Sequence, residues 1–209
     1  MPLSNDAKDM FIAPGMSAFT SASIEDLSGM SPGRDGWVTS FLLNSIFRGG
    51  LAGPVKPTLL NFLRRTHAAF GEYGLARSRT LAYLAAPDTV MEYLAAISHW
   101  EGYLSQAYQA YCLLDMGKRQ MFSPGDGTGI QRLCHLYNRS KHVEKAITSG
   151  QLTRNETLAI WLTNDGLNCT DSHLTYIEAA GLLRHLASIA EAVEDPVTMR
   201  EKLTALASR

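Results

Sequence analysis

Large apolar and aromatic side chains recur at intervals of three and four positions in the stretch that follows Asp88. An α-helix places such positions on one face. A face of this length is stable in water only when it packs against other helices. The spacing therefore predicts a long helix with Asp88 as its N-cap, embedded in a helical core. The residues on the predicted face are Tyr93, Ile97, Trp100, Leu104, Tyr108, Tyr111 and Leu114.

Four other stretches show helical spacing and supply partners for this helix. Glycine or proline marks the ends of several of them, as at Gly49, Pro87 and Gly150. Gly71 and Gly74 are candidate breaks inside the second stretch. The connections are short enough for consecutive helices to pack antiparallel. The predicted helices cover residues 37–47, 58–86, 129–149 and 175–193, and a shorter helix follows Pro196.

The hydrophobic period changes between residues 157 and 170. Leu158, Ile160 and Leu162 stand at alternate positions, as in a half-buried strand, and residues 164–166 read Asn-Asp-Gly, which favours a tight turn. A small β-hairpin is expected there. The chain is thus predicted to be mainly α, an antiparallel helical bundle with a small β-hairpin insertion.

The first 35 residues differ in composition from the rest of the chain. They are rich in Ser, Gly, Pro and Met and lack periodic apolar positions, so we expect an irregular N-terminal arm that contributes no core element. Residues 36–209 are predicted to form a single helical-bundle domain. A length of 209 residues with 45% hydrophobic side chains suffices for one packed core.

The charge balance excludes two kinds of charge distribution in this chain. With 19 Lys and Arg against 20 Asp and Glu, the chain has neither a uniformly basic coat for nucleic acid nor an acidic solvating tail. Basic residues gather in 36–87 and 118–154, so any site for a polyanion is local. The N-terminus has no basic stretch followed by an apolar one, and no apolar run reaches the roughly 20 residues of a membrane span. We expect a cytoplasmic protein without membrane contact.

The cysteines agree with this compartment. Cys112, Cys134 and Cys169 are odd in number and include no Cys-x-x-Cys pair, so neither a disulfide framework nor a structural zinc site is expected. The chain also lacks the Glu-x-x-His and His-Glu-x-x-His patterns of di-iron and zinc helices. We therefore predict no metal and no cofactor.

Residues 132–144 are the segment most able to carry chemistry. On a helix, one stripe is largely apolar and packs on the bundle, with Leu133, Leu136, Ser140, Val143 and Ile147 as its members. A second stripe runs along the edge of the first, with Asn138 and Lys141 further toward solvent. The second stripe consists of Arg132, His135, Arg139 and His142.

Histidine beside arginine suits phosphodiester chemistry. A histidine exchanges a proton near pH 7, and an arginine holds a phosphate and stabilises its developing charge. These two roles suffice for metal-independent RNA cleavage by attack of the 2′-hydroxyl. A salt-bridged or solvated helix face is the alternative interpretation of the same spacing.

The segment 136–142, Leu-Tyr-Asn-Arg-Ser-Lys-His, resembles the motif helix of HEPN-type proteins, and 160–167 with the helix that follows is similar to bacterial proteins of that kind without an assigned function. The resemblance implies a homodimeric helical bundle that acts as a metal-independent ribonuclease, with an arginine and a histidine from each subunit at the dimer cleft. It also allows a regulatory protein partner. Carried over to this chain, it implies His142 as the catalytic histidine, Arg139 as the arginine and Asn138 as a polar helper.

The resemblance and the stripe together leave two functions open. One is binding and cleavage of RNA, or binding of a nucleotide, with Arg132, His135, Lys141 and Tyr137 on the substrate. The other is a catalytically inactive helical binding module, because only two residues separate Arg139 from His142, fewer than is usual in the family.

Tyrosines on the long helix are a further candidate for nucleic-acid contact. Tyr93, Tyr103, Tyr108 and Tyr111 could stack on bases. Such a stripe more often belongs to a core or to a dimer interface, and this is the interpretation we favour.

Overall fold

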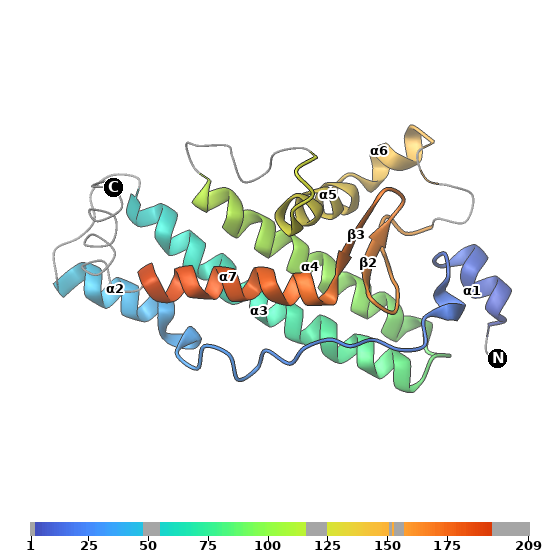
Figure 1. The fold of residues 1–209 in the computed structure, drawn as a ribbon, viewed down its shortest axis with the longest axis horizontal. Coiled ribbons are helices and arrows are strands. Elements are labelled where there is room, and N and C mark those ends of the chain that lie inside the picture. The colour runs from blue at the N-terminus through green and yellow to red at the C-terminus, as the bar shows by residue number, and fades with distance from the viewer. Residues whose placement is uncertain (1–2, 48–54, 116–124, 151, 153–156, 194–209) are drawn as a thin grey trace.

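The computed structural model describes residues 3–47, 55–115, 125–150, 152 and 157–193 (Figure 1). This part of the chain is mainly helical with one small sheet, as the sequence predicts, and its longest helices run along the long axis of the molecule. The helices are α1 (Asn5–Phe11), α2 (Trp37–Phe47), α3 (Val55–Ala85), α4 (Val90–Leu114), α5 (Gly129–Lys141), α6 (Val143–Thr148) and α7 (Tyr176–Val193). The strands are β1 (Trp161–Leu162), β2 (Gly166–Cys169) and β3 (Ser172–Thr175).

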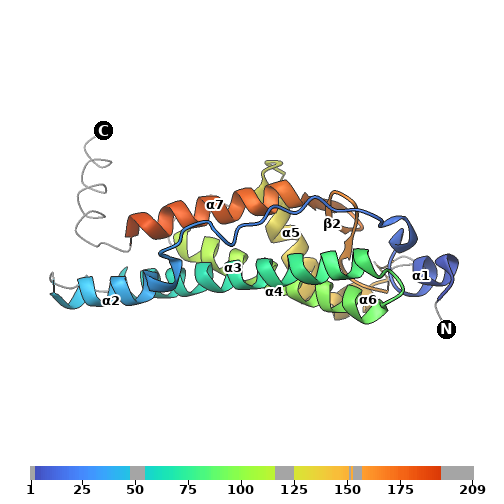
Figure 2. The ribbon, with the colours of Figure 1, turned by 90° about the horizontal axis from the view of Figure 1, so that it is seen from below.

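The antiparallel pair α3 and α4 forms the base of the bundle, and α7 lies in a second layer over it (Figure 2). Aromatic rings from all three helices meet at Trp100. Its ring centroid is 5.5 Å from that of Tyr73 on α3 and 5.4 Å from that of Tyr176 on α7, and its Nε1 donates to Thr80 Oγ1 at 3.1 Å. Burial of these large rings together is the main apolar contribution to the core.

Tyrosines of α4 tie this helix to α7. Tyr93, Tyr103 and Tyr111 are all fully buried. The hydroxyl of Tyr103 donates to the carbonyl of Ala179, and that of Tyr111 donates to the carbonyl of Leu182. The core interpretation of these three tyrosines is confirmed, since each ring fills the bundle and is closed to bases.

The long helix that the sequence predicts is present, but its cap differs. Thr89 occupies the N-cap position without a side-chain cap, and the Asp88 carboxylate instead accepts a hydrogen bond from Lys8 Nζ at 3.1 Å. The cap prediction is wrong because Lys8 is buried and needs a counter-charge. In α3, Gly71 and Gly74 cause no break, since the helix is continuous through both.

The hairpin is confirmed and extended by one strand. The three strands pair antiparallel in the order β1-β2-β3, and Thr163 N donates to Gly166 O at 2.9 Å in the first turn. The sequence did not predict strand β3, because the turn that connects it to β2, residues 170 and 171, contains no glycine or proline to indicate a turn. Gly166 has a steric role in this sheet, since a Cβ there would lie 2.2 Å from the carbonyl oxygen of Leu174.

The segment before α2 is irregular over most of its length but belongs to the core. It runs alongside α7 in both views (Figures 1 and 2). The expectation that it contributes no core element is wrong, because five of its apolar side chains are buried in the same hydrophobic core as those of α3, α4 and α7. The buried ones are Ala13, Met16, Phe19, Ile24 and Leu27.

Hydrogen bonds hold this segment from both sides. Its carbonyls accept from α3, where Tyr73 donates to Glu25 O at 3.1 Å and Arg77 to Ile24 O at 3.0 Å. The Glu25 carboxylate also pairs with Arg184 of α7. Hydrogen bonds and an ion pair to neighbouring helices can therefore hold a segment in the core even though its apolar residues follow no helical or strand spacing.

Two predicted helix faces need correction. The helix expected over 129–149 is interrupted at His142, so α5 and α6 are separate, and Ile147 is 60% exposed instead of lying on the core stripe. In α7, Ala180, Leu183 and Leu186 are buried as expected, but Ile177 is 74% exposed. The short helix predicted after Pro196 lies outside the described residues.

No helix in the described ranges combines the length and the apolar character that crossing a membrane requires.

Candidate functional site

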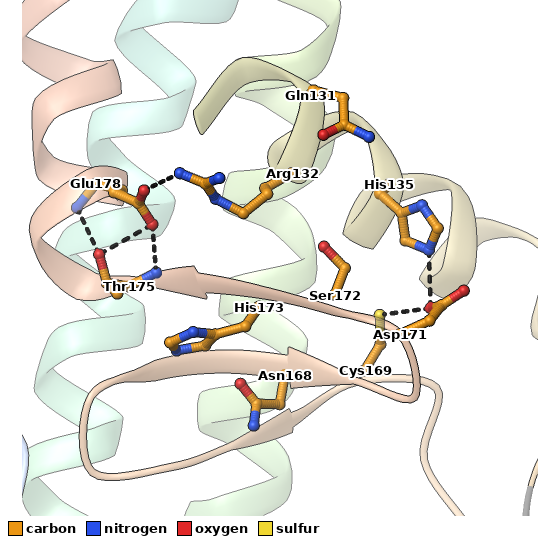
Figure 3. Close-up of a pocket in the computed structure, with 10 residues that line it drawn as sticks. All are labelled: Gln131, Arg132, His135, Asn168, Cys169, Asp171, Ser172, His173, Thr175 and Glu178. Atoms are coloured by element: carbon orange, nitrogen blue, oxygen red, sulfur yellow. Dashed lines mark hydrogen bonds and ion pairs between the residues drawn. The ribbon is translucent and has the colours of Figure 1, made fainter. Parts of the chain in front are cut away.

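Helix α5 lies against the β2–β3 hairpin, and the two elements form the candidate site (Figure 3). Thr128 is the N-cap, and its hydroxyl accepts from Gln131 N at 3.1 Å. Leu133 and Leu136 are fully buried against the bundle. Their burial sets the rotation of α5 and turns the Arg132 edge of the helix toward the sheet.

Three members of the predicted Arg/His stripe contact the hairpin or α7. Arg132 forms an ion pair with Glu178. The next member, His135, places its Nε2 2.8 Å from Asp171 Oδ1. Arg139 Nη2 donates to Thr170 Oγ1 at 2.9 Å. The stripe therefore follows the predicted helical spacing and joins α5 to the turn between β2 and β3 and to the start of α7.

The carboxylates in these contacts remain ionised more readily than usual. Burial raises the pKa of Glu178, but hydrogen bonds from Thr175 and the Arg132 guanidinium outweigh it, so the pKa lies below the ordinary value. Burial likewise raises the pKa of Asp171, while hydrogen bonds from His135 and Cys169 lower it further than burial raises it. Both groups are therefore counter-charges for the stripe at neutral pH.

His142, the histidine that the resemblance marks as catalytic, lies apart from this contact. It is the C-cap of α5 with φ −114° and ψ 35°, and its half-exposed ring has Nδ1 3.7 Å from Glu144 Oε1. Arg139 reaches the β2–β3 turn instead. The two side chains thus have different partners within the chain, because α5 ends between them.

The remaining predicted site residues lie on the other side of α5. The ring of Tyr137 stacks on Tyr108, with centroids 4.3 Å apart and planes at 21°, and Lys141 Nζ lies 5.7 Å from the Tyr137 centroid. Exposed Asn138 donates to Cys134 Sγ at 3.4 Å. Tyr137 thus serves packing between α4 and α5.

A wide, open pocket of about 800 Å³ lies between α5, the hairpin and the first turn of α7 (Figure 3). Of the predicted site residues, only Arg132 and His135 line it. Sequence reasoning missed the lining residues of the hairpin, since it placed no second turn there. The hairpin contributes Asn168, Cys169, Asp171, Ser172, His173 and Thr175.

His135, Cys169 and Asp171 form a cluster at one end of the pocket. One donor atom from each residue lies within 4.8 Å of the other two, and Cys169 Sγ is 3.4 Å from Asp171 Oδ1. Burial raises the pKa of Cys169 to about 11, so its thiol is protonated at neutral pH. As it stands, the cluster suits a histidine whose ring is oriented by a carboxylate, with a neutral thiol beside them.

Asn168 and His173 are paired across β2 and β3, and both line the pocket. Asn168 Oδ1 is buried, and no donor within the described ranges reaches it. His173 Nε2 is 3.5 Å from Asp165 Oδ1. A buried acceptor without a donor costs about 1–3 kcal/mol, which a donor on a bound ligand would recover.

Comparison of the chain with protein-family models, with curated proteins and with solved structures finds no match. The resemblance to HEPN-type proteins therefore stays a prediction.

Proposed function

We propose that this chain is a helical binding module that does not cleave RNA, and that its ligand site is the pocket between α5 and the β2–β3 hairpin. The observation that carries the proposal is the set of partners of the Arg/His stripe. Arg132 pairs with Glu178, and His135 pairs with Asp171. Arg132 thus joins α5 to α7, and His135 joins α5 to the β2–β3 turn.

These pairings limit what the pocket can bind. A surface that grips a phosphate chain needs cations whose charge is not already balanced. Breaking the Arg132–Glu178 pair would leave a partly buried carboxylate without its counter-charge, which is costly. The pocket therefore suits a polar ligand that carries both hydrogen-bond donors and acceptors. One of its donors would bind Asn168 Oδ1.

The test is RNA cleavage in the presence of EDTA by the full chain and by His142→Ala, measured side by side on a fluorescent single-stranded RNA. We expect no cleavage by either protein. Cleavage by the parent chain that is lost in His142→Ala would overturn the proposal and establish a histidine-dependent, metal-independent ribonuclease.

RNA binding is the second candidate function, and a different observation favours it. Asn138, Lys141 and His142 are exposed, and within the described part of the chain they contact Cys134, Tyr137 and Glu144 of α5 and α6. An exposed lysine and histidine at the end of a helix suit contact with phosphates.

Salt dependence tests this second function. If RNA binds there, Lys141→Gln should reduce the slope of log affinity against log salt by about one phosphate contact. Arg64→Gln, on an exposed part of α3, is the matched control and should leave the slope unchanged. Equal slopes for the parent chain and Lys141→Gln would exclude Lys141 from the RNA contact.

A homodimer remains part of both candidate functions. Light scattering coupled to size exclusion gives the mass directly, and a mass twice the 22.9 kDa of the chain would support it. A mass of one chain at micromolar concentration would count against it.

A further inference from the structure

We propose that His135, Cys169 and Asp171 bind one transition-metal ion, with zinc as the best match, and that the pocket opens onto its remaining coordination position. The proposal deepens the proposed function, since it names the ligand class of the same pocket. It reverses our expectation from the sequence that the chain binds no metal.

The first support is the convergence of three donor atoms from two segments that are distant in the sequence, helix α5 and the β2–β3 hairpin. His135 comes from α5, Cys169 from the end of β2 and Asp171 from the following turn. The three side chains point toward one another (Figure 3), and their donor atoms lie within 4.8 Å of one another. The Arg139–Thr170 hydrogen bond joins α5 to the β2–β3 turn, and the Arg132–Glu178 pair joins α5 to α7, so the donors are already positioned.

The second support is that the donor separations lie close to those around a tetrahedral ion, since one fits, one is short by about half an ångström and the His135–Cys169 separation is within 4.8 Å. Zinc lies about 2.3 Å from sulfur and about 2.0–2.2 Å from nitrogen or oxygen, so its ligand atoms lie roughly 3.3–3.6 Å apart. The 3.4 Å between Cys169 Sγ and Asp171 Oδ1 already fits. The 2.8 Å between His135 Nε2 and Asp171 Oδ1 must widen by about half an ångström, which side-chain rotation can supply.

The third support is the chemistry of the set. Thiolate and imidazole favour zinc and cobalt over magnesium and calcium, which prefer oxygen ligands. On binding, the ion displaces the proton of the Cys169 thiol to solvent, and the resulting thiolate and the Asp171 carboxylate together balance the charge of a divalent ion. The positive charge of Arg139 lies near Asp171 and opposes the ion, but its hydrogen bond to Thr170 also fixes the turn that carries the ligands.

Three protein ligands leave one tetrahedral position for water or a ligand atom, as in zinc sites that bind a substrate. All three ligands line the pocket, together with Ser172 and His173, so the fourth position would open into it. A polar molecule in the pocket could thus coordinate the ion with one atom and donate to Asn168 Oδ1 with another.

The experiment is titration of the chelator-treated full chain with Co²⁺, followed by displacement with Zn²⁺. We expect one ion per chain and a thiolate-to-cobalt absorption band that Zn²⁺ removes. Cys169→Ser should lose the band, and Asp171→Asn should weaken binding by more than the roughly 10–100-fold that loss of an outer-shell partner costs.

Cys134→Ser and His142→Ala are the matched controls. The first removes a cysteine and the second a histidine that lie near His135 in the sequence but are not proposed ligands. Both should bind Co²⁺ as the parent chain does. Circular dichroism spectra that match the parent chain establish that Cys169→Ser is folded.

Absence of the cobalt band in the folded parent chain would overturn the proposal, and so would a band that persists in Cys169→Ser. The RNA assay above contains EDTA and does not depend on this result. Failure of the metal site is therefore distinguishable from failure of the proposed function.

Discussion

His135 and Asp171 lie 36 positions apart in the chain, yet the imidazole Nε2 and the carboxylate Oδ1 are 2.8 Å apart. This contact places the β2–β3 turn against the middle of α5. It also brings Cys169 to the same point, since the cysteine is two residues from Asp171. One polar contact between a helix and a turn thus assembles the cluster at the end of the pocket.

The His135–Asp171 pair should add little to stability. The His135 side chain is 39% exposed and that of Asp171 is 58% exposed, so water screens their attraction. A double-mutant cycle with His135→Ala and Asp171→Ala, measured by urea unfolding, should give a coupling free energy of about 0–1 kcal/mol. A coupling well above this range would mean that the pair stabilises the fold, and would weaken the case for a metal ion that must separate His135 from Asp171.

Trp100→Ala should destabilise the chain strongly. The side chain is fully buried at the meeting point of three helices, and its loss leaves a cavity and removes the donor to Thr80 Oγ1. We expect a loss of about 3–5 kcal/mol in the free energy of unfolding, measured by urea titration followed by circular dichroism. Met91→Ala, at a position 71% exposed on the same helix, is the control and should change it by less than about 0.5 kcal/mol.

Two glycine substitutions should have opposite effects. Gly166→Ala places a Cβ against a backbone carbonyl that cannot move without breaking the β2–β3 pairing, so a loss of about 1–3 kcal/mol is expected. Gly74→Ala meets nothing within 4 Å inside α3 and should raise the free energy of unfolding by about 0.5–1 kcal/mol. Thermal unfolding of the two variants beside the parent chain measures both, and a tolerated Gly166→Ala would contradict the sheet packing described here.

Acid should weaken the contact between α5 and α7. Because the pKa of Glu178 is lower in the folded chain than its ordinary value of 4.5, its ionised form stabilises the fold above that pH. This contribution is lost as the pH falls through the folded pKa. Glu178→Gln should therefore melt below the parent chain at pH 7, and the difference should shrink below about pH 4.5. A difference that is constant from pH 7 to pH 3 would mean that Glu178 acts through shape alone.

The helices were predictable because their signals are local. The spacing around Trp100 and the Asn-Asp-Gly turn at 164–166 need no knowledge of the rest of the chain. The prediction that Ile177 is buried was wrong because burial is not a local property. The spacing of Ile177 fits a core face, but the face of α7 that is covered depends on where α3, α4 and the N-terminal segment lie. The interruption of the helix at His142 could not be predicted either, because the helical spacing of apolar residues continues without a break to Ile147.

The candidate site was predictable only on its helical side. The spacing of Arg132, His135 and Arg139 placed them on one edge of α5, and that edge faces the hairpin. Their partners Asp171 and Glu178 could not be assigned, because contacts across long sequence separations depend on how the hairpin docks. The alternation of polar and apolar residues over 172–175 was the sequence signal that could have predicted β3, and with it the hairpin wall of the pocket.

The N-terminal segment has a consequence for the order in which this chain can fold. Its carboxylate at Glu25 pairs with Arg184, and Ser31 donates to Glu191, so these contacts join residues 159 and 160 positions apart. Phe19 stacks on Tyr83 and contacts Tyr93, so the segment has apolar contacts with α3 and α4 that do not depend on α7. Contacts with α3 and α4 can therefore form before α7 docks, whereas the Glu25 and Ser31 contacts require α7 to be in place.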